Sequence, residues 1–245
     1  MMHNNLKAVR SVVLAVAGMG VCLGAQAGTG TSLLSPGYQT QLESWLGEGR
    51  LALTNIYSKA AGDTSLDFHK ASDGKGRTFS IMEATNASGQ TWIVGGYNPQ
   101  SWNSSGSYNM SSDNSQRTAF IFNLTSGVIR PQTPRGYAID MVGAYQTYNG
   151  AEYGPVFGYG HDLFVSGNLS SAGYSNMYSY IDPVKGGFGE SLLDGSQYSK
   201  PDVTYGALQI FTIGVVPEPA TYALLLAGLC MLAASRLYKR RATLA

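Results

Sequence analysis

Short apolar runs separated by turn-forming clusters constrain the fold of this chain more than any other feature. The runs are rich in β-branched and aromatic residues and are bounded by Gly, Ser and Asn. They cover residues 51–57, 78–82, 91–94, 119–124, 162–165 and 207–213. Many short strands with turns between them predict a mainly β (α+β) fold, in which two antiparallel sheets pack as a sandwich with a few short helices.

Two of these regions carry more specific predictions. Alternation along 51–57 predicts that Leu51, Leu53 and Tyr57 share one face of a strand. The cluster Asn86-Ala87-Ser88-Gly89 lies between two runs and is typical of a hairpin turn.

The most continuously apolar run contains Phe120, Phe122 and Leu124. Such a run is typical of a strand that is buried on both faces. We therefore expect a central strand inside the sandwich core, with Phe157 and Ile210 buried near it.

One helix is expected, at residues 36–46. Ser35 is a suitable N-cap, Pro36 fits the first helical position, and Gly47 can end the helix. Residues 98–115 are rich in Ser and Asn, which predicts a polar loop that is either mobile or part of a binding surface.

The N-terminus has the pattern of a secretory signal peptide, residues 1–27. A basic start precedes an apolar stretch at 12–23, and small residues Ala25 and Ala27 come before Gly28. A short membrane anchor is the alternative, but the apolar stretch is too short to cross about 30 Å of hydrocarbon. We expect a signal helix that signal peptidase removes after Ala27.

The C-terminus, residues 217–245, is organised differently. Pro217, Glu218 and Pro219 precede an uncharged apolar stretch and a tail rich in Arg and Lys. A helix from Ala220 to Tyr238 would be about 28 Å long, enough for one transmembrane helix. The basic tail would stay cytoplasmic, so the rest of the chain would lie on the other side.

The order of these three elements closely resembles the PEP-CTERM sorting signal of Gram-negative bacteria. The resemblance implies an exosortase, a membrane transpeptidase, that cuts at or near Pro217-Glu218-Pro219. It also implies export across the inner membrane, transient anchoring, and a final place at the cell surface or outside the cell. An ordinary anchor behind a Pro-rich linker is the alternative.

The remaining body, residues 28–216, has the size of one domain. It contains no cysteine, so disulfides cannot stabilise it, and its ten basic and fourteen acidic side chains give a net charge of −4. Without a basic stripe, nucleic-acid binding is not expected.

Segments of the body resemble the TLDc domain, a family associated with oxidation resistance in eukaryotes. They occur in the family's order and span about Leu42 to Ile213. The matching segments are Phe68–Thr78, Gly95-Gly96-Tyr97 with Trp102, Phe120–Leu124, Gly154–Leu163, Leu193-Asp194-Gly195 and Leu208–Phe211.

Two departures limit what the resemblance implies. Ser72 stands where the family typically has Cys, so no thiol chemistry carries over. Ala207 and Gln209 replace acidic residues of the final strand. The resemblance implies a non-enzymatic interaction domain. Eukaryotic relatives bind a proton-pumping ATPase, a partner that cannot be assumed for an exported bacterial chain.

The residues that could form a reactive pocket are His69 and His161 with the nearby Asp73 and Asp162. Metal-ligand spacing and a Gly-x-Ser-x-Gly elbow are absent, so we expect no metal, no cofactor and no catalytic residue. We expect Asp73 to cap the turn that its following glycines form. The alternative is a hydrolytic enzyme that uses either histidine with a neighbouring Asp.

The body is also rich in tyrosine. Tyrosine rings can stack on the sugars of an extracellular polysaccharide, although filling the sandwich is the more ordinary role. The expected partners are therefore an extracellular polysaccharide or an envelope protein. A purely structural biofilm or surface component is a further alternative.

Overall fold

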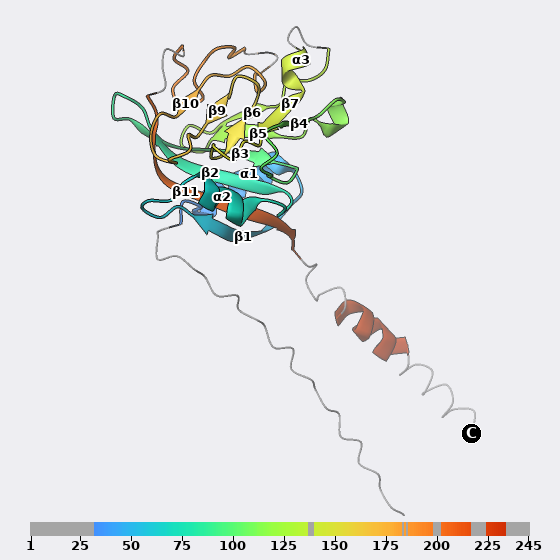
Figure 1. Cartoon of the computed structure of the whole chain (residues 1–245). Helices are drawn as coiled ribbons and strands as arrows, with labels where there is room; N and C mark the ends of the chain where they lie inside the picture. Colours follow the sequence, from blue (N-terminus) through green and yellow to red (C-terminus); the bar gives the residue numbers. More distant parts are fainter. Residues whose placement is uncertain are drawn as a thin grey trace, which may run out of the picture.

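The computed structural model describes residues 32–136, 140–182, 184, 186–197, 202–216 and 224–233. The described part is mainly β, with two antiparallel sheets and short helices, as predicted (Figure 1). The predicted processing residues Ala25, Ala27, Gly28, Pro217, Glu218 and Pro219 lie outside the described residues.

The larger sheet has six strands in the order β1-β11-β2-β3-β5-β6, and every neighbouring pair is antiparallel. These strands are β1 (Leu51–Ser58), β2 (Thr78–Thr85), β3 (Thr91–Asn98), β5 (Phe120–Asn123), β6 (Val128–Pro131) and β11 (Thr204–Val215).

The smaller sheet has five strands in the order β10-β9-β8-β7-β4. They are β4 (Tyr108–Met110), β7 (Tyr145–Tyr148), β8 (Val156–Phe157), β9 (Leu163–Phe164) and β10 (Tyr174–Ser175). The helices are α1 (Pro36–Leu46), α2 (Ser65–Ser72), α3 (Asp140–Gly143) and the 3₁₀ turn η1 (Asn114–Gln116).

Helix α1 has the predicted boundaries. The Ser35 side chain accepts the Tyr38 N–H at 3.2 Å, and Gly47 ends the helix with a left-handed φ of 73°. Leu42 is fully buried and packs α1 onto the six-stranded sheet. The hairpin turn Asn86–Gly89 is also confirmed, between β2 and β3.

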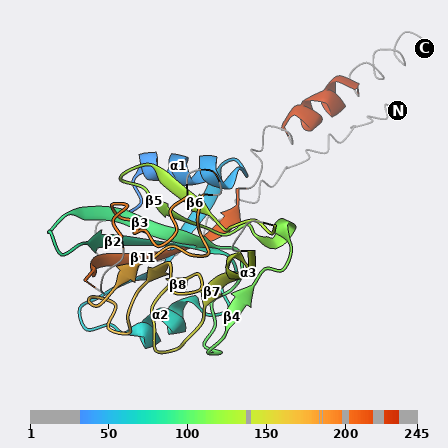
Figure 2. The ribbon, with the colours of Figure 1, turned by 90° about the horizontal axis from the view of Figure 1, so that it is seen from above.

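The six-stranded sheet lies between two different layers. Figure 2 shows α1 on one face and the strands of the smaller sheet, with α2, on the other. Phe120, Phe122 and Leu124 belong to the cluster beneath α1, whereas Phe157 and Ile210 belong to the cluster between the sheets. All five residues are buried as predicted, but the sheet separates the first three from the other two.

Two adjacent glycines explain how β3 fits between these layers. A Cβ at Gly95 would lie 2.7 Å from Cζ of Phe122, and a Cβ at Gly96 would lie 2.5 Å from Cζ of Phe157. Consecutive strand residues face opposite sides, so each glycine admits one phenylalanine ring against the backbone.

The prediction for β1 was partly wrong. Leu51 and Leu53 lie on the α1 face, but Tyr57 packs in the cluster between the sheets. The register with β11 shifts between Asn55 and Tyr57, and a bulge of this kind reverses the side on which later side chains point.

Segment 98–115 is more ordered than a simple polar loop. Trp102 is fully buried, and its Nε1 donates a hydrogen bond to Thr78 Oγ1 at 3.0 Å. Strand β4 also lies within this segment. The Ser- and Asn-rich composition concealed one of the largest core residues.

The expected membrane-spanning stretch, Ala220 to Tyr238, is described only in part, and residues 224–233 are helical. Within the described ranges, no helix has both the length and the apolar character needed to cross a membrane.

Candidate functional site

His69 lies on α2 with acceptors around both ring nitrogens. Nδ1 lies 2.8 Å from Asp73 Oδ1, and Nε2 lies 3.0 Å and 3.1 Å from the carbonyl oxygens of Gly150 and Tyr153. The ring is 5% exposed and fixes α2 to a distant loop. These contacts occupy the nitrogens that a catalytic histidine would offer to a substrate.

Asp73 does not cap the glycine turn as predicted. Its two carboxylate oxygens contact side chains instead, Nδ1 of His69 and the hydroxyl of Ser104, the latter at 2.7 Å. The turn itself forms as expected, because Gly74 and Gly76 have φ values of 70° and 77°.

Asp162 is completely buried. Its Oδ2 accepts backbone N–H bonds from Tyr178, Ser179 and Tyr180 at 2.7 to 2.8 Å. Burial raises the pKa of Asp162 to about 8, although the three N–H groups act in the opposite direction. The carboxyl group therefore organises the 178–180 segment, a structural role.

Gly158 lies directly against the same carboxyl group. A Cβ at this position would overlap Oδ1 of Asp162, and the φ of Gly158 is 80°. This position therefore admits only glycine, and the cause is the buried carboxyl group together with the left-handed φ.

The side chain of His161 contacts other residues than that of Asp162, its neighbour in the sequence. Its ring stacks on Phe164, with centroids 5.1 Å apart and planes inclined by 8°, and Nδ1 lies 3.1 Å from the Tyr174 hydroxyl. Burial lowers the pKa of His161, which favours the neutral ring. The structure thus brings His69 to Asp73 but gives His161 and Asp162 different partners.

The carbonyl of Tyr153 contacts His69, and its ring centroid is 6.0 Å from that of His161. Tyr153 therefore connects the two histidine regions. Across the described parts of the chain, no group of three or more His, Cys, Asp or Glu side chains is arranged to hold a metal ion.

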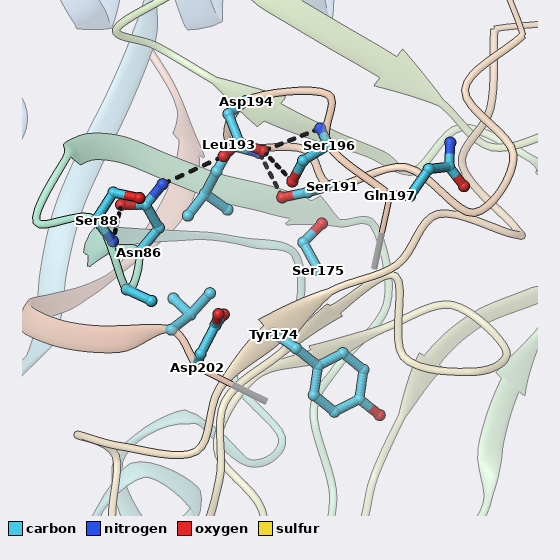
Figure 3. A pocket seen from close by; sticks show the side chains of 12 residues that line it. Asn86, Ser88, Tyr174, Ser175, Ser191, Leu193, Asp194, Ser196, Gln197 and Asp202 are labelled. Carbon is cyan, nitrogen blue, oxygen red and sulfur yellow. Dashed lines mark hydrogen bonds between the residues drawn. The ribbon is translucent and has the colours of Figure 1, made fainter. Parts of the chain in front are cut away.

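A separate cavity of about 230 Å³ opens at one end of the six-stranded sheet (Figure 3). It lies between the β2–β3 turn, β10, the segment 191–197 and the start of β11. Its lining is Asn86, Ala87, Ser88, Tyr174, Ser175, Ser191, Leu193, Asp194, Ser196, Gln197, Asp202 and Val203.

Asp194 stabilises the wall of this cavity. Its Oδ1 accepts the Ser196 N–H and hydroxyl at 3.0 and 2.7 Å, and Oδ2 accepts the Asn86 amide at 3.2 Å. Partial burial raises the pKa of Asp194, but these hydrogen bonds outweigh it and the pKa is lowered overall. The remaining groups offer hydroxyls, amides and the Asp202 carboxylate, which points toward the open space in Figure 3.

The sequence did not indicate this cavity as a site. Asn86 was recognised only as part of a turn, and Asp194 only as part of a segment that resembles the TLDc family; the two are 108 residues apart. Turn chemistry is local, so the Asn86 turn contains no signal that it meets Asp194.

Models of two known families match successive parts of the chain. The model of the TLDc domain matches residues 28–204, and the model of the PEP-CTERM protein-sorting motif matches residues 215–241. A search of the curated proteins found no match. The two matches follow one another along the chain, and the first covers well over half of it. The chain therefore belongs to the TLDc domain family and ends in a PEP-CTERM sorting motif.

Proposed function

We propose that this protein is a surface-displayed, non-enzymatic binding protein, whose TLDc domain uses the cavity of Figure 3 to hold a hydroxylated ligand. The PEP-CTERM motif marks the chain as an exosortase-targeted surface protein. The ligand is part of an extracellular polysaccharide or of an envelope protein.

The proposal includes two processing steps. Signal peptidase removes residues 1–27 after Ala25-Gln26-Ala27, which leaves Gly28 at the N-terminus. The segment from Ala220 to Tyr238 anchors the chain until an exosortase cuts at Pro217-Glu218-Pro219. The glutamate between two φ-restricted prolines gives the enzyme a rigid, charged recognition element.

The position of the cavity along β11 carries the proposal. Asp202 and Val203, which line the cavity, lie just before the first residue of β11, and the sorting motif begins at its last residue, Val215. A strand of this length extends over about 35 to 40 Å. The cavity therefore lies at the start of β11, and the anchoring segment follows the opposite end of the same strand.

This arrangement suits a protein that captures material outside the cell. While the anchor holds the β11 end near the membrane, the cavity opens away from it. The lining is rich in hydroxyl and amide groups, which can exchange hydrogen bonds with a hydroxylated ligand. The histidines do not line this cavity, and their hydrogen bonds hold the domain together.

A capture experiment tests this function. The purified chain is incubated with the polysaccharide and the envelope proteins of the producing cells, and the retained material is measured. Ala87→Trp places a large ring in the cavity from an exposed turn position, so binding should fall about tenfold or more. Thr40→Trp, on an exposed position of α1, is the matched control and should bind as the wild type does.

Equal capture by Ala87→Trp and by the wild type would overturn the cavity as the binding site.

The processing steps are tested separately. Terminal sequencing should find Gly28 at the start of exported material, and Glu218→Ala should leave an uncut precursor in the membrane. Exported protein that begins at Met1, or normal maturation of Glu218→Ala, would contradict them.

A further inference from the structure

A row of side chains crosses the smaller sheet from edge to edge. Tyr108 pairs with Tyr148, Tyr148 with Val156, Val156 with Phe164, and Phe164 with Tyr174. Directly paired residues lie on the same face of a sheet. Four of the five strands therefore contribute an aromatic ring to this line, and Val156 of β8 lies between the rings of Tyr148 and Phe164.

This line faces away from the six-stranded sheet. The next residues along β8 and β9, Phe157 and Leu163, belong to the cluster between the sheets. Because side chains alternate along a strand, Val156 and Phe164 lie on the opposite, outer face. The tyrosines of the row are partly exposed, whereas Val156 and Phe164 are buried.

Two further rings lie over Phe164. Tyr153 approaches it with a centroid distance of 5.1 Å, and His161 stacks nearly parallel to it at the same distance. The φ of His161 is 64°, a left-handed conformation that is uncommon for a residue with a side chain. Strain of this kind is often retained where a side chain has a function.

The aromatic face, defined as Tyr108, Tyr148, Tyr153, His161, Phe164 and Tyr174, is uncharged. Burial, with the neighbouring tyrosines, raises the pKa of Tyr108 to about 12, and burial lowers the pKa of His161. At neutral pH the partly exposed tyrosines and His161 therefore present apolar ring surfaces and hydroxyl groups without net charge, and the buried Phe164 supports them from below.

The aromatic face is continuous with the cavity of Figure 3. Tyr174 belongs to both, since it lines the cavity while its ring points away from the cavity and its hydroxyl meets His161 (Figure 3). Five strands at about 4.8 Å spacing make the row about 19 Å long. That length exceeds a single sugar ring, so a ligand that fills both regions must be a chain.

We propose that the aromatic face binds a neutral extracellular polysaccharide, whose sugar rings stack along the row while one end or branch enters the cavity. This inference rests on the proposed function and adds the ligand class to it. Sugar rings combine apolar C–H faces with hydroxyls at their edges, which matches tyrosine in both respects. A nucleic acid would need a basic groove, and the body carries a net charge of −4.

Affinity electrophoresis of the purified chain tests this site. The gels contain polysaccharide from the producing cells, hydroxyethyl cellulose as a neutral polymer, or alginate as an anionic one. The wild type should be retarded by its own polysaccharide and more strongly by the neutral polymer than by alginate.

Tyr153→Leu replaces the stacking ring with a smaller aliphatic side chain and should weaken retardation about fivefold, while Tyr153→Phe keeps the ring and should behave as the wild type does. His161→Gly removes the other ring and permits the left-handed backbone, so the variant should lose binding and still fold, with a lower melting temperature because the contacts with Tyr174 and Phe164 are lost. Thermal melts of each variant verify folding.

The outcomes separate this inference from the proposed function. If the wild type captures polysaccharide but Tyr153→Leu and His161→Gly are retarded as strongly as the wild type, the aromatic face is not the site, and Ala87→Trp alone then decides whether the cavity is. Stronger retardation by alginate would overturn the neutral ligand class. Capture of envelope proteins alone would leave the cavity function standing and overturn the polysaccharide.

Discussion

The two sheets of this domain are stabilised in different ways. The strands β1, β2, β3 and β11 of the larger sheet are eight to twelve residues long, whereas those of the smaller sheet have only two to four residues. The larger sheet buries apolar side chains on both faces. Strands as short as β8 and β9 form few ladder hydrogen bonds, so the smaller sheet depends on bonds between side chains and backbone.

Several such bonds converge beside α3 and β7. Thr133 Oγ1 donates to the Ser179 carbonyl at 2.9 Å, Ser179 Oγ donates to the Val142 carbonyl at 2.6 Å, and the buried Tyr180 hydroxyl donates to the Gln146 carbonyl at 2.6 Å. Together with Asp162, these bonds fix loops that ladder pairing alone would leave free. The apolar sheet therefore acts as the scaffold, and the hydrogen-bonded sheet presents the aromatic face.

The largest effect should come from the larger sheet. Phe122→Ala removes a fully buried ring, whose centroid lies 6.0 Å from that of Trp45 and 6.2 Å from that of Phe79. The free energy of unfolding should fall by roughly 3–5 kcal/mol, a large share of the roughly 5–15 kcal/mol typical of a domain. Chemical denaturation of the purified protein measures this change.

Phe188→Ala is the control for that variant. Phe188 is 51% exposed and contacts Tyr178 at the surface, so its loss should change stability much less. Equal losses for both variants would contradict the assignment of the core to the larger sheet.

The larger sheet was predictable because its information is local. Long runs of alternating or continuous apolar residues identify strands, and the turn at Asn86–Gly89 joins two of them directly. The bulge in β1 could not be predicted, because the register shift arises from pairing with β11, more than 150 residues away. The face of the strand predicted for Tyr57 was therefore wrong.

The next prediction concerns Asp162 and the smaller sheet. Because burial raises its pKa to about 8 in the folded protein, the folded state keeps a proton that the unfolded chain releases near pH 4. Stability contributed by this group is therefore present at low pH and declines as pH rises from about 5 to 8. One proton corresponds to about 1.4 kcal/mol per pH unit over that range.

Asp162→Asn has nearly the same shape and keeps an acceptor for the three N–H groups, so its unfolding free energy should lack this decline. His161 acts in the opposite direction, since its lowered pKa costs stability below about pH 6.5. Denaturation between pH 5 and 9 distinguishes the contributions of Asp162 and His161. If the unfolding free energy of Asp162→Asn declined with pH as steeply as that of the wild type, Asp162 would not be the cause of the decline.

The smaller sheet and the cavity were largely beyond prediction. Its two-residue strands are too short to produce a periodic pattern. The aromatic row joins strands from Tyr108 to Tyr174, and only the folded registers align them. Helix α2 did have a local signal, because Thr64 and Asp67 have the spacing of a capping box, and the Asp67 carboxylate accepts the Thr64 N–H at 2.9 Å.

The smallest effect should come from His69, which joins α2 to the loop between β7 and β8. His69→Gln keeps one donor that can reach the carbonyls of Gly150 and Tyr153 but loses the contact with Asp73. The unfolding free energy should fall by on the order of 1 kcal/mol, the net value of one hydrogen bond.

Polysaccharide binding should be unchanged in this variant, because His69 belongs to neither the cavity nor the aromatic face. His69→Ala removes all three contacts and should cost more, which shows that the small loss in His69→Gln reflects the bonds that remain. A stable His69→Gln protein that has lost a hydrolytic activity of the wild type would instead make the His69–Asp73 pair catalytic. The smaller sheet and the loop with Gly150 and Tyr153 would then form an enzyme site. The larger sheet would still be a scaffold, but the smaller sheet would not be a binding surface alone.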